Sequence, residues 1–160
     1  MSDRLREKEE RIQHILGCLA AEASNGTPII VEGKKDTETL RKLAIGGKII
    51  TAKSGKSLLD VVSEVEESRP EEAILLLDYD KRGKELTRLL KRHLETTKIV
   101  PNTTFWRELF SIVGKEIREV ESLTAYLETL KKKVTKHRNP AFRHISVREA
   151  FEKPNRPRKA

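Results

Sequence analysis

Apolar residues recur along the chain in a pattern that predicts alternating helices and short strands. Residues 3–24 carry apolar side chains at helical spacing, which predicts an amphipathic helix that stops at Asn25-Gly26. Four short apolar runs follow and predict buried strands, at residues 28–31, 48–51, 73–77 and 98–100. Amphipathic stretches between these runs predict helices, near residues 37–44, 57–69 and 83–95. The strands and helices therefore follow the order βαβαβαβ after the first helix.

This order predicts an α/β fold, because strands joined by short helical crossovers pair in parallel with right-handed connections. Two further helices are predicted after the last strand, one ending at Gly114 and one over residues 123–130. We therefore expect a compact, Rossmann-like sheet of four parallel strands with flanking helices. The chain divides into an N-terminal amphipathic helix, an α/β domain with C-terminal helices and an extended basic arm, at residues 1–26, 27–133 and 134–160.

Positive charge is concentrated at the C-terminal end of the chain. Residues 131–160 contain eleven Lys and Arg against two Glu, whereas the first 130 residues contain 22 basic and 23 acidic residues. Basic tails usually contact polyanions, above all nucleic acid, although a solubilising tail is the simpler alternative. The candidates for such contacts here are Lys131, Lys132, Lys133, Lys136, Arg138, Arg143 and Arg148. We expect this arm to become ordered on its partner.

The composition argues against several other classes of protein. No apolar run approaches the ~20 residues of a membrane span, and the highly charged first residues argue against a signal peptide. The single Cys18 cannot form an internal disulfide, which favours a cytoplasmic protein. Aromatic residues make up 4% of the chain, so stacking on single-stranded bases is not the expected mode of recognition. Structured RNA or a duplex backbone suits such a chain better, and we expect RNA in preference to DNA and no membrane contact.

Acidic residues follow two of the predicted strands. Glu32 and Asp36 come after the run at 28–31, and Asp78 and Asp80 come after the run at 73–77. Carboxyl ends of parallel strands face one crevice, where carboxylates repel one another and an oxygen-seeking cation such as Mg²⁺ relieves that repulsion. Simpler roles are a helix cap for Asp36 or Asp80 and a turn for Asp78. Glu32 is harder to explain in this way, because Glu is a poor cap and an unusual residue at the end of a buried strand.

Several residues near these acids are candidates for phosphate contact. Ser54-Gly55-Lys56-Ser57 resembles part of a nucleotide-binding loop, but Ile50 stands where the full motif requires glycine, which argues against an NTPase. Ser54 and Gly55 remain candidates to bind a phosphate oxygen at the start of the following helix. The residues that we assign to phosphate or nucleic-acid contact in this region are Lys34, Lys35, Ser54, Lys56, Lys81 and Arg82. Gly83 is expected to let the backbone turn sharply into the next helix.

The two acidic segments together resemble the Toprim domain. They are Val31-Glu32-Gly33-Lys34-Lys35-Asp36 and Leu77-Asp78-Tyr79-Asp80-Lys81-Arg82-Gly83, and the resemblance spans about residues 27–121. Topoisomerases, bacterial-type primases, recombination proteins, certain nucleases and the ribosomal-RNA maturase family share this domain. The stretch from Ile30 to Leu43 is especially similar to the maturase family, and the whole chain looks like the small stand-alone Toprim proteins of archaea.

The resemblance implies a catalytic metal site. Mg²⁺, or Mn²⁺ in its place, would be held by Asp78 and Asp80, with Glu32 as a further ligand or as general acid and base. These three residues are therefore the catalytic and metal-binding candidates. Residues that match the family pattern as structural supports are Gly33, Asp36 and Gly83. Another acid at the edge of the site is a further expectation, from Glu119 or Glu121, although a solvated charge pair is the alternative.

Parts that topoisomerases and primases need are missing from this sequence. A topoisomerase carries its nucleophilic tyrosine on a separate gate domain, and a primase needs a polymerase subdomain and usually a zinc module, which one Cys cannot build. The favoured hypothesis is a Mg²⁺-dependent phosphodiesterase or nuclease that processes structured RNA. The alternatives are a non-catalytic module that binds RNA or the ribosome, and an accessory protein of DNA repair or recombination.

Overall fold

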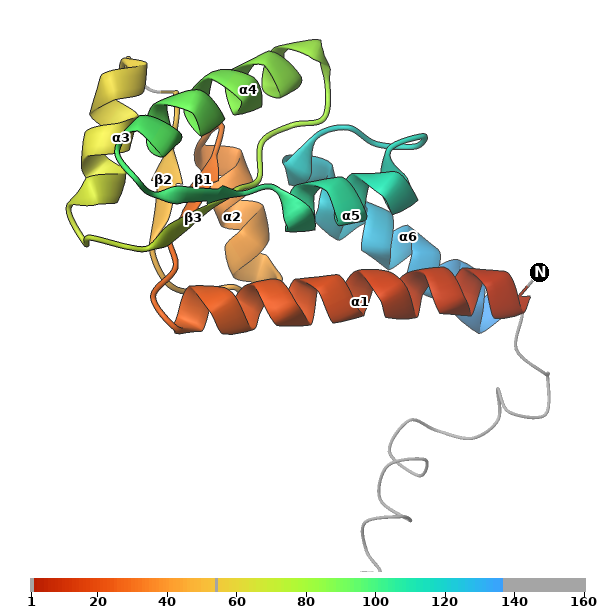
Figure 1. Cartoon of the computed structure of the whole chain (residues 1–160). Coiled ribbons are helices and arrows are strands. Elements are labelled where there is room, and N and C mark those ends of the chain that lie inside the picture. Colours follow the sequence, from red (N-terminus) through yellow and green to blue (C-terminus); the bar gives the residue numbers. More distant parts are fainter. Residues whose placement is uncertain (1, 54, 137–160) are drawn as a thin grey trace, which may run out of the picture.

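Four parallel strands form one sheet in the order β2-β1-β3-β4 in the computed structural model, which describes residues 2–53 and 55–136 (Figure 1). The strands are β1 Ile29–Val31, β2 Ile49–Thr51, β3 Glu72–Leu75 and β4 Val100–Asn102. Strands β1 and β3 occupy the centre and pair directly, with Ile30 opposite Leu75. The two acidic segments therefore leave adjacent strands at the same edge of the sheet. The predicted α/β fold with four parallel strands is confirmed.

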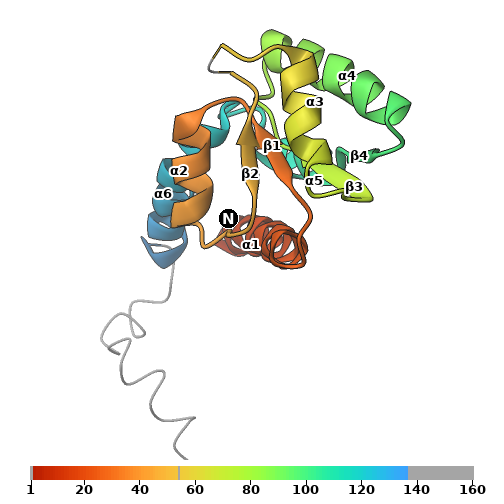
Figure 2. The same cartoon turned by 90° about the vertical axis from the view of Figure 1, so that its left-hand side faces the viewer.

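Helices cover both faces of this sheet (Figures 1 and 2). They are α1 Ser2–Ser24, α2 Lys34–Lys42, α3 Leu58–Glu66, α4 Lys81–Thr96, α5 Thr104–Val113 and α6 Leu123–Lys136, with a short 3₁₀ turn, η1, over Val120–Ser122. Alternate strand residues face opposite layers, as the pleat requires. Ile30 and Leu75 pack among residues of α3 and α4, whereas Ile29 and Ile74 pack among residues of α1, α5 and α6.

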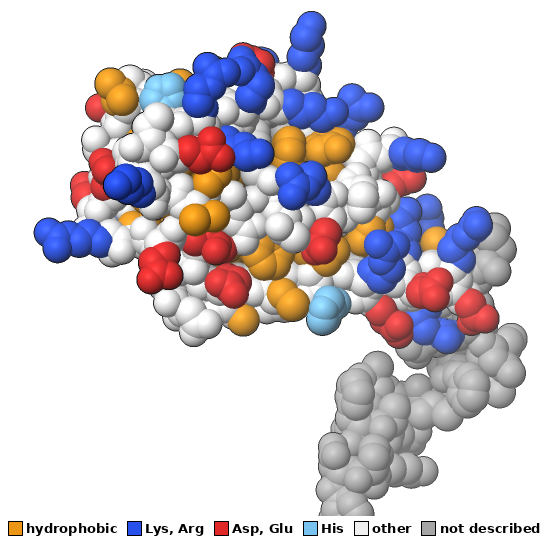
Figure 3. All heavy atoms as spheres, in the orientation of Figure 1, with side chains coloured by type: hydrophobic (Ala, Val, Ile, Leu, Met, Phe, Trp, Pro, Cys, Tyr) orange, Lys and Arg blue, Asp and Glu red, His pale blue; other side chains and the backbone are white. Residues whose placement is uncertain are grey.

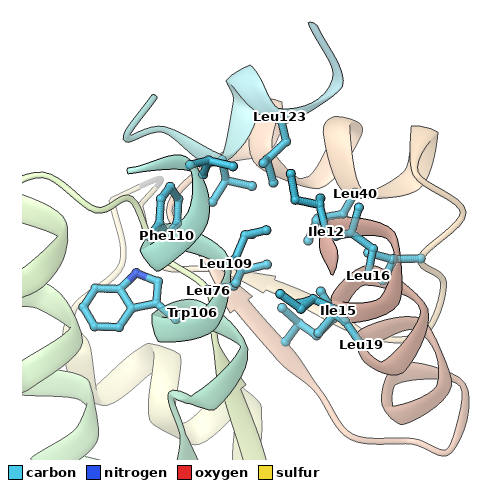
Figure 4. Close-up of a cluster of buried hydrophobic side chains, with 14 of the residues drawn as sticks. Ile12, Ile15, Leu16, Leu19, Leu40, Leu76, Trp106, Leu109, Phe110 and Leu123 are labelled. Atoms are coloured by element: carbon cyan, nitrogen blue, oxygen red, sulfur yellow. The ribbon is translucent and has the colours of Figure 1, made fainter. Parts of the chain in front are cut away.

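Helix α1 belongs to the larger of the two hydrophobic clusters. Its apolar stripe packs against α5, α6 and the sheet, and the side chains meet as Figure 4 shows. The labelled members are Ile12, Ile15, Leu16, Leu19, Leu40, Leu76, Trp106, Leu109, Phe110 and Leu123. Burial of this stripe stabilises α1, since tertiary packing contributes more to helix stability than intrinsic propensity does.

Several element boundaries differ from the sequence prediction, two of them for a clear physical reason. Helix α2 begins at Lys34, not near residue 37, because the Asp36 side chain accepts a hydrogen bond from the Gly33 backbone and fixes the helix start there. The last strand lies over Val100–Asn102, not over residues 98–100. Lys98 has a φ of 65° in the turn that ends α4, and Pro101 lies inside the strand, which its place at the sheet edge permits.

Helix α6 extends into the predicted basic arm. It continues to Lys136, and Val134 is buried against the core, so residues 134–136 are helical and not extended. Exposed lysines line the outer side of this helix, at positions Lys131, Lys132, Lys133 and Lys136. The remaining predicted contacts of the arm, Arg138, Arg143 and Arg148, lie outside the described residues, as does Ser54. Within the described ranges, no helix is both long enough and apolar enough to cross a membrane.

Candidate functional site

Glu32 is a buried carboxylate at the end of central strand β1. The residue is 5% exposed, and its Oε1 lies 3.1 Å from the Nζ of Lys53. Its Oε2 is also buried, and within residues 2–53 and 55–136 it has no hydrogen-bond partner. A buried charged oxygen without a partner carries a substantial desolvation cost. This orphaned oxygen is the feature of the site that the rest of the fold does not explain.

Asp36 supports the first turn of α2. Its Oδ2 accepts a hydrogen bond of 3.0 Å from the Gly33 backbone N–H, as the third helical residue and not as the N-cap that the sequence allowed. Burial raises the pKa of Asp36, the Gly33 hydrogen bond lowers it, and the negative charges of Glu121 and Glu32 raise it further. Asp36 is therefore held in the same negative field as Glu32.

Asp78 joins the end of β3 to the C-terminal part of the chain. Its Oδ1 accepts a hydrogen bond of 3.0 Å from the backbone N–H of Val120, at the start of η1. Burial raises the pKa of Asp78 to about 7, against the lowering effect of the Val120 hydrogen bond, and neighbouring carboxylates add to the rise. These neighbours are Asp36, Glu32 and Asp80. The arrangement concentrates negative charge at the ends of β1 and β3.

Asp80 has a structural role as the N-cap of α4. Its Oδ1 accepts a hydrogen bond of 2.8 Å from the Gly83 backbone N–H, so the cap that the sequence allowed is confirmed. An ionised carboxylate has further lone pairs, so this cap leaves the second oxygen of Asp80 available. Lys81 and Arg82 follow as exposed residues in the first turn of α4.

Gly83 brings helix α4 close to both acidic segments. A Cβ built at Gly83 would lie 2.7 Å from the carbonyl carbon of Asp78 and 3.0 Å from Oε2 of Glu32. Only a residue without a side chain allows this approach. The predicted reason for this glycine was wrong, because Gly83 lies within α4 and its φ is not positive. Its function is close packing against the acids and not a sharp turn.

The acids open into a hollow of about 270 Å³. Its lining consists of Glu32, Gly33, Lys34, Lys35, Asp36, Lys53, Asp78 and Glu121. The structure thus brings six of the predicted site residues together, whereas Asp80, Lys81 and Arg82 are outside the lining. Gly33 has an extended backbone with a φ of −147°, and a Cβ there would meet no atom within 4 Å. The missing side chain at Gly33 therefore leaves room in the hollow.

Lys53 is a site residue that the sequence analysis missed. Its backbone N–H donates a 2.9 Å hydrogen bond to the carbonyl of Glu32, which continues the pairing of β2 with β1. The available signal was a basic residue just after the predicted strand at 48–51. Glu121, one of the two acids expected at the edge, lines the hollow, and its carbonyl accepts a hydrogen bond from Thr39 of α2. Glu119 is not part of the lining.

Lys56 lies apart from the hollow. Its Nζ is 2.6 Å from Oε1 of Glu64 and donates to the carbonyl of Thr51 at 3.1 Å. The ammonium therefore joins α3 to the end of β2. The capping box predicted from Ser57 and Asp60 is confirmed, with both reciprocal hydrogen bonds at 3.1 Å.

Aromatic residues of α5 hold the segment between the two aspartates. The ring of Tyr79 stacks on Phe110 at a centroid distance of 5.0 Å and meets Trp106 edge-on at 5.1 Å. The indole Nε1 of Trp106 donates a 2.8 Å hydrogen bond to the carbonyl of Leu77, directly before Asp78. These buried contacts position the Asp78 and Asp80 backbone, since aromatic pairs contribute about 0.5–1.5 kcal/mol beyond burial.

The donor atoms at this site fit a hard divalent cation. They are carboxylate oxygens, one of them buried and unpaired, and Mg²⁺ prefers oxygen ligands while keeping several waters. In the part of the chain that the structure describes, no group of three or more His, Cys, Asp or Glu side chains is placed so that it could hold a metal ion. The assignment of Glu32, Asp78 and Asp80 as metal ligands, completed by water molecules, therefore stays a prediction.

Known proteins similar to this chain agree with the fold. The Toprim domain matches residues 27–112. A UPF0292 protein of Methanocaldococcus jannaschii is 37% identical over 119 residues, which cover 74% of this chain and 91% of that protein. A UPF0292 protein of Archaeoglobus fulgidus is 32% identical over 112 residues, covering 70% and 86%. A solved structure of an Aquifex aeolicus protein superposes with a TM-score of 0.58 at 28% identity, covering 68% of this chain and 94% of that one.

Proposed function

The chain belongs to the Toprim-domain family, and from this premise we propose that it is a Mg²⁺-dependent phosphodiesterase that processes structured RNA. Membership of this family supports a metal-dependent role in nucleic-acid metabolism, since Toprim domains typically bind divalent metal, usually Mg²⁺. Hydrolysis, RNA as substrate and association with the ribosome or a processing complex are our proposals. The special similarity to the ribosomal-RNA maturases remains a prediction from the sequence.

The orphaned Oε2 of Glu32 is the observation that supports this proposal most strongly. It lies buried beside an open hollow in which Asp36, Asp78 and Glu121 add negative charge. Carboxylates gathered in this way are costly to keep ionised unless a cation or a proton compensates them. A bound Mg²⁺ would stabilise the negative charge that develops on the phosphate and on the leaving oxygen.

The residues of the chain have distinct roles in this proposal. Asp78 and Asp80 hold the ion, Asp36 keeps the start of α2 in place, and Gly83 keeps α4 against the acids. Glu32 either ligates the ion or transfers a proton to or from a phosphodiester oxygen. Its carboxylate directly follows strand β1 and pairs with Lys53.

Two cationic surfaces are suited to hold the nucleic-acid backbone. Lys and Arg side chains gather over helix α4 in Figure 3, and this exposed set consists of Lys81, Arg82, Lys84, Arg88, Lys91 and Arg92. The second surface is the lysine row of α6. Helix α4 begins at the Asp80 cap, so its basic surface starts beside the acids. Phosphate contacts of this kind give affinity without sequence readout and weaken steeply with salt.

A non-catalytic RNA-binding module is the second candidate. The observation that favours it is that all three catalytic candidates already have partners within the fold. Glu32 is paired with Lys53, Asp78 accepts a hydrogen bond from the backbone of Val120, and Asp80 caps α4. In this case the acids would maintain the fold, and the basic surfaces would dock the protein on RNA or the ribosome.

The double variant Asp78→Asn with Asp80→Asn tests the proposal. Radiolabelled RNA hairpins and duplex DNA of equal length are incubated with Mg²⁺, and cleavage is measured on denaturing gels alongside binding by filter retention. We expect the wild-type protein to cut RNA hairpins, and the double variant to lose cleavage but keep binding. Glu128→Gln, an exposed acid on α6, is the control and should cut like wild type. Full activity of the double variant would refute the catalytic assignment, and cleavage of DNA alone would refute RNA as substrate.

A further inference from the structure

Lys53 carries the ammonium group that balances the buried Glu32. The Nζ of Lys53 lies 3.1 Å from Oε1 of Glu32, whose side chain is 6% exposed, while the Lys53 side chain is 46% exposed. The pairing of β2 with β1 fixes both residues at the sheet edge, since the Lys53 N–H donates to the Glu32 carbonyl. A buried anion and a half-exposed cation thus meet at the mouth of the hollow.

This pair is the main internal compensation for the acids of the hollow. Four carboxylates line it, from Glu32, Asp36, Asp78 and Glu121. In the described part of the chain, no second ion pair reaches any of these four. Lys34 and Lys35 line the same hollow as exposed residues, but no ion pair joins them to Glu32.

We propose that Lys53 is an exchangeable counter-ion, which neutralises Glu32 before metal binding and is displaced when a divalent cation takes its place. This inference rests on the proposed metal site. A divalent cation at the Glu32 carboxylate repels the ammonium, so metal binding weakens the Lys53 ion pair. The Lys53 side chain is able to leave, because it is flexible and half-exposed and its charged end lies at ion-pair distance from Glu32.

The displaced ammonium is then free to contact phosphate. Lys53 stays attached to the rim of the hollow through its backbone, so its Nζ remains within the reach of one side chain. A phosphate group of the nucleic acid would then neutralise the Lys53 ammonium in place of the Glu32 carboxylate. Metal and phosphate would therefore promote each other's binding, as coupled ligands must do reciprocally.

A purely structural role of the ion pair would affect metal affinity differently from competition between Lys53 and the metal. If Lys53 only helped to fold the site, its removal would disorder Glu32 and leave metal binding weaker or unchanged. If Lys53 competes with the metal, its removal strengthens metal binding while the metal-free protein becomes less stable. The sign of the change in affinity therefore distinguishes the two roles.

Titration of the full chain with Mn²⁺, followed by electron paramagnetic resonance without nucleic acid, tests this inference. We expect Lys53→Met to bind Mn²⁺ at least roughly fivefold more tightly than wild type, the lower end of ordinary coupling. Lys53→Arg keeps the charge and should stay near wild type. Lys115→Met, which removes an exposed lysine that does not line the hollow, is the matched control and should bind Mn²⁺ like wild type.

Stability measurements on the same proteins guard against misfolding as an explanation. Without metal, Lys53→Met should unfold at a lower temperature than wild type, and added Mn²⁺ should restore more stability to it than to wild type. Equal or weaker Mn²⁺ binding by Lys53→Met, with wild-type binding intact, overturns the counter-ion inference alone. No Mn²⁺ binding by the wild-type protein overturns the proposed metal site and this inference with it.

Discussion

Replacing Gly83 by alanine tests whether helix α4 must approach the acids closely. The added Cβ would lie 2.7 Å from the carbonyl carbon of Asp78 and 3.0 Å from Oε2 of Glu32. The first neighbour is backbone and cannot move aside cheaply. The variant keeps the backbone N–H that donates to Asp80, so loss of the cap does not confuse the result.

Two opposing terms set the size of the effect. Alanine in place of glycine favours a helix by up to about 1 kcal/mol. Overpacking against atoms that cannot relax costs about 1–3 kcal/mol, and a contact with backbone belongs at the upper end. The clash therefore wins, and we expect Gly83→Ala to lose about 2 kcal/mol of stability. For a domain of this size that loss lowers Tm by roughly 4–8 °C.

Thermal unfolding followed by circular dichroism measures the change, with Gly17→Ala as the matched control. Gly17 also lies within a helix, but a Cβ there would meet no atom within 4 Å. Without a clash only helix propensity remains, so Gly17→Ala should raise Tm by roughly 2–4 °C. Equal stabilisation of both variants would refute the inference that α4 lies too close to the acids for a side chain at position 83.

Three further predictions concern other parts of the site. Because burial and neighbouring acids raise the pKa of Asp78 to about 7, the native state binds a proton more tightly than the unfolded chain. Denaturant titrations in EDTA should therefore show stability falling as pH rises from about 4 to 7, more steeply than in Asp78→Asn. Trp106→Phe leaves the carbonyl of Leu77 unpaired and should cost about 1–3 kcal/mol in the same assay, and wild-type stability would contradict this. Replacing Lys91 and Arg92 of α4 by Gln should weaken RNA binding and reduce its salt dependence, and an unchanged slope of binding constant against salt would exclude this surface.

The sheet and the main acids were predictable because they depend on local pattern and one general rule. Buried apolar runs alternate with amphipathic stretches, and parallel strands place their carboxyl ends at one edge. Glu32 and Asp78 therefore had to lie near each other once β1 and β3 were central neighbours, as the structure shows. The cap at Asp80 was visible as an alternative, because Asp is a common N-cap and a helix was predicted soon after it.

Other features depend on contacts between distant segments. The Lys53 ion pair requires β2 to lie beside β1, and the order of strands in a sheet cannot be predicted from the local pattern of apolar and polar residues. Glu121 lies at the hollow beside two long-range hydrogen bonds, from the Val120 N–H to Asp78, 42 residues earlier in the chain, and from Thr39 to the carbonyl of Glu121. The position of β4 was misjudged because the sheet edge tolerates a proline that a central strand would exclude.

The most direct test of the central claim uses the nucleic acid that the protein binds in its own host. The full chain is purified in EDTA, its bound nucleic acid is sequenced, and Mg²⁺ is then added while fragment length is followed on gels. We predict that the bound material is structured RNA, that Mg²⁺ shortens it at defined positions, and that the variant with Asp78→Asn and Asp80→Asn leaves it intact. Bound RNA that stays whole in Mg²⁺, or that both proteins cut equally, would contradict a Toprim phosphodiesterase acting through these acids.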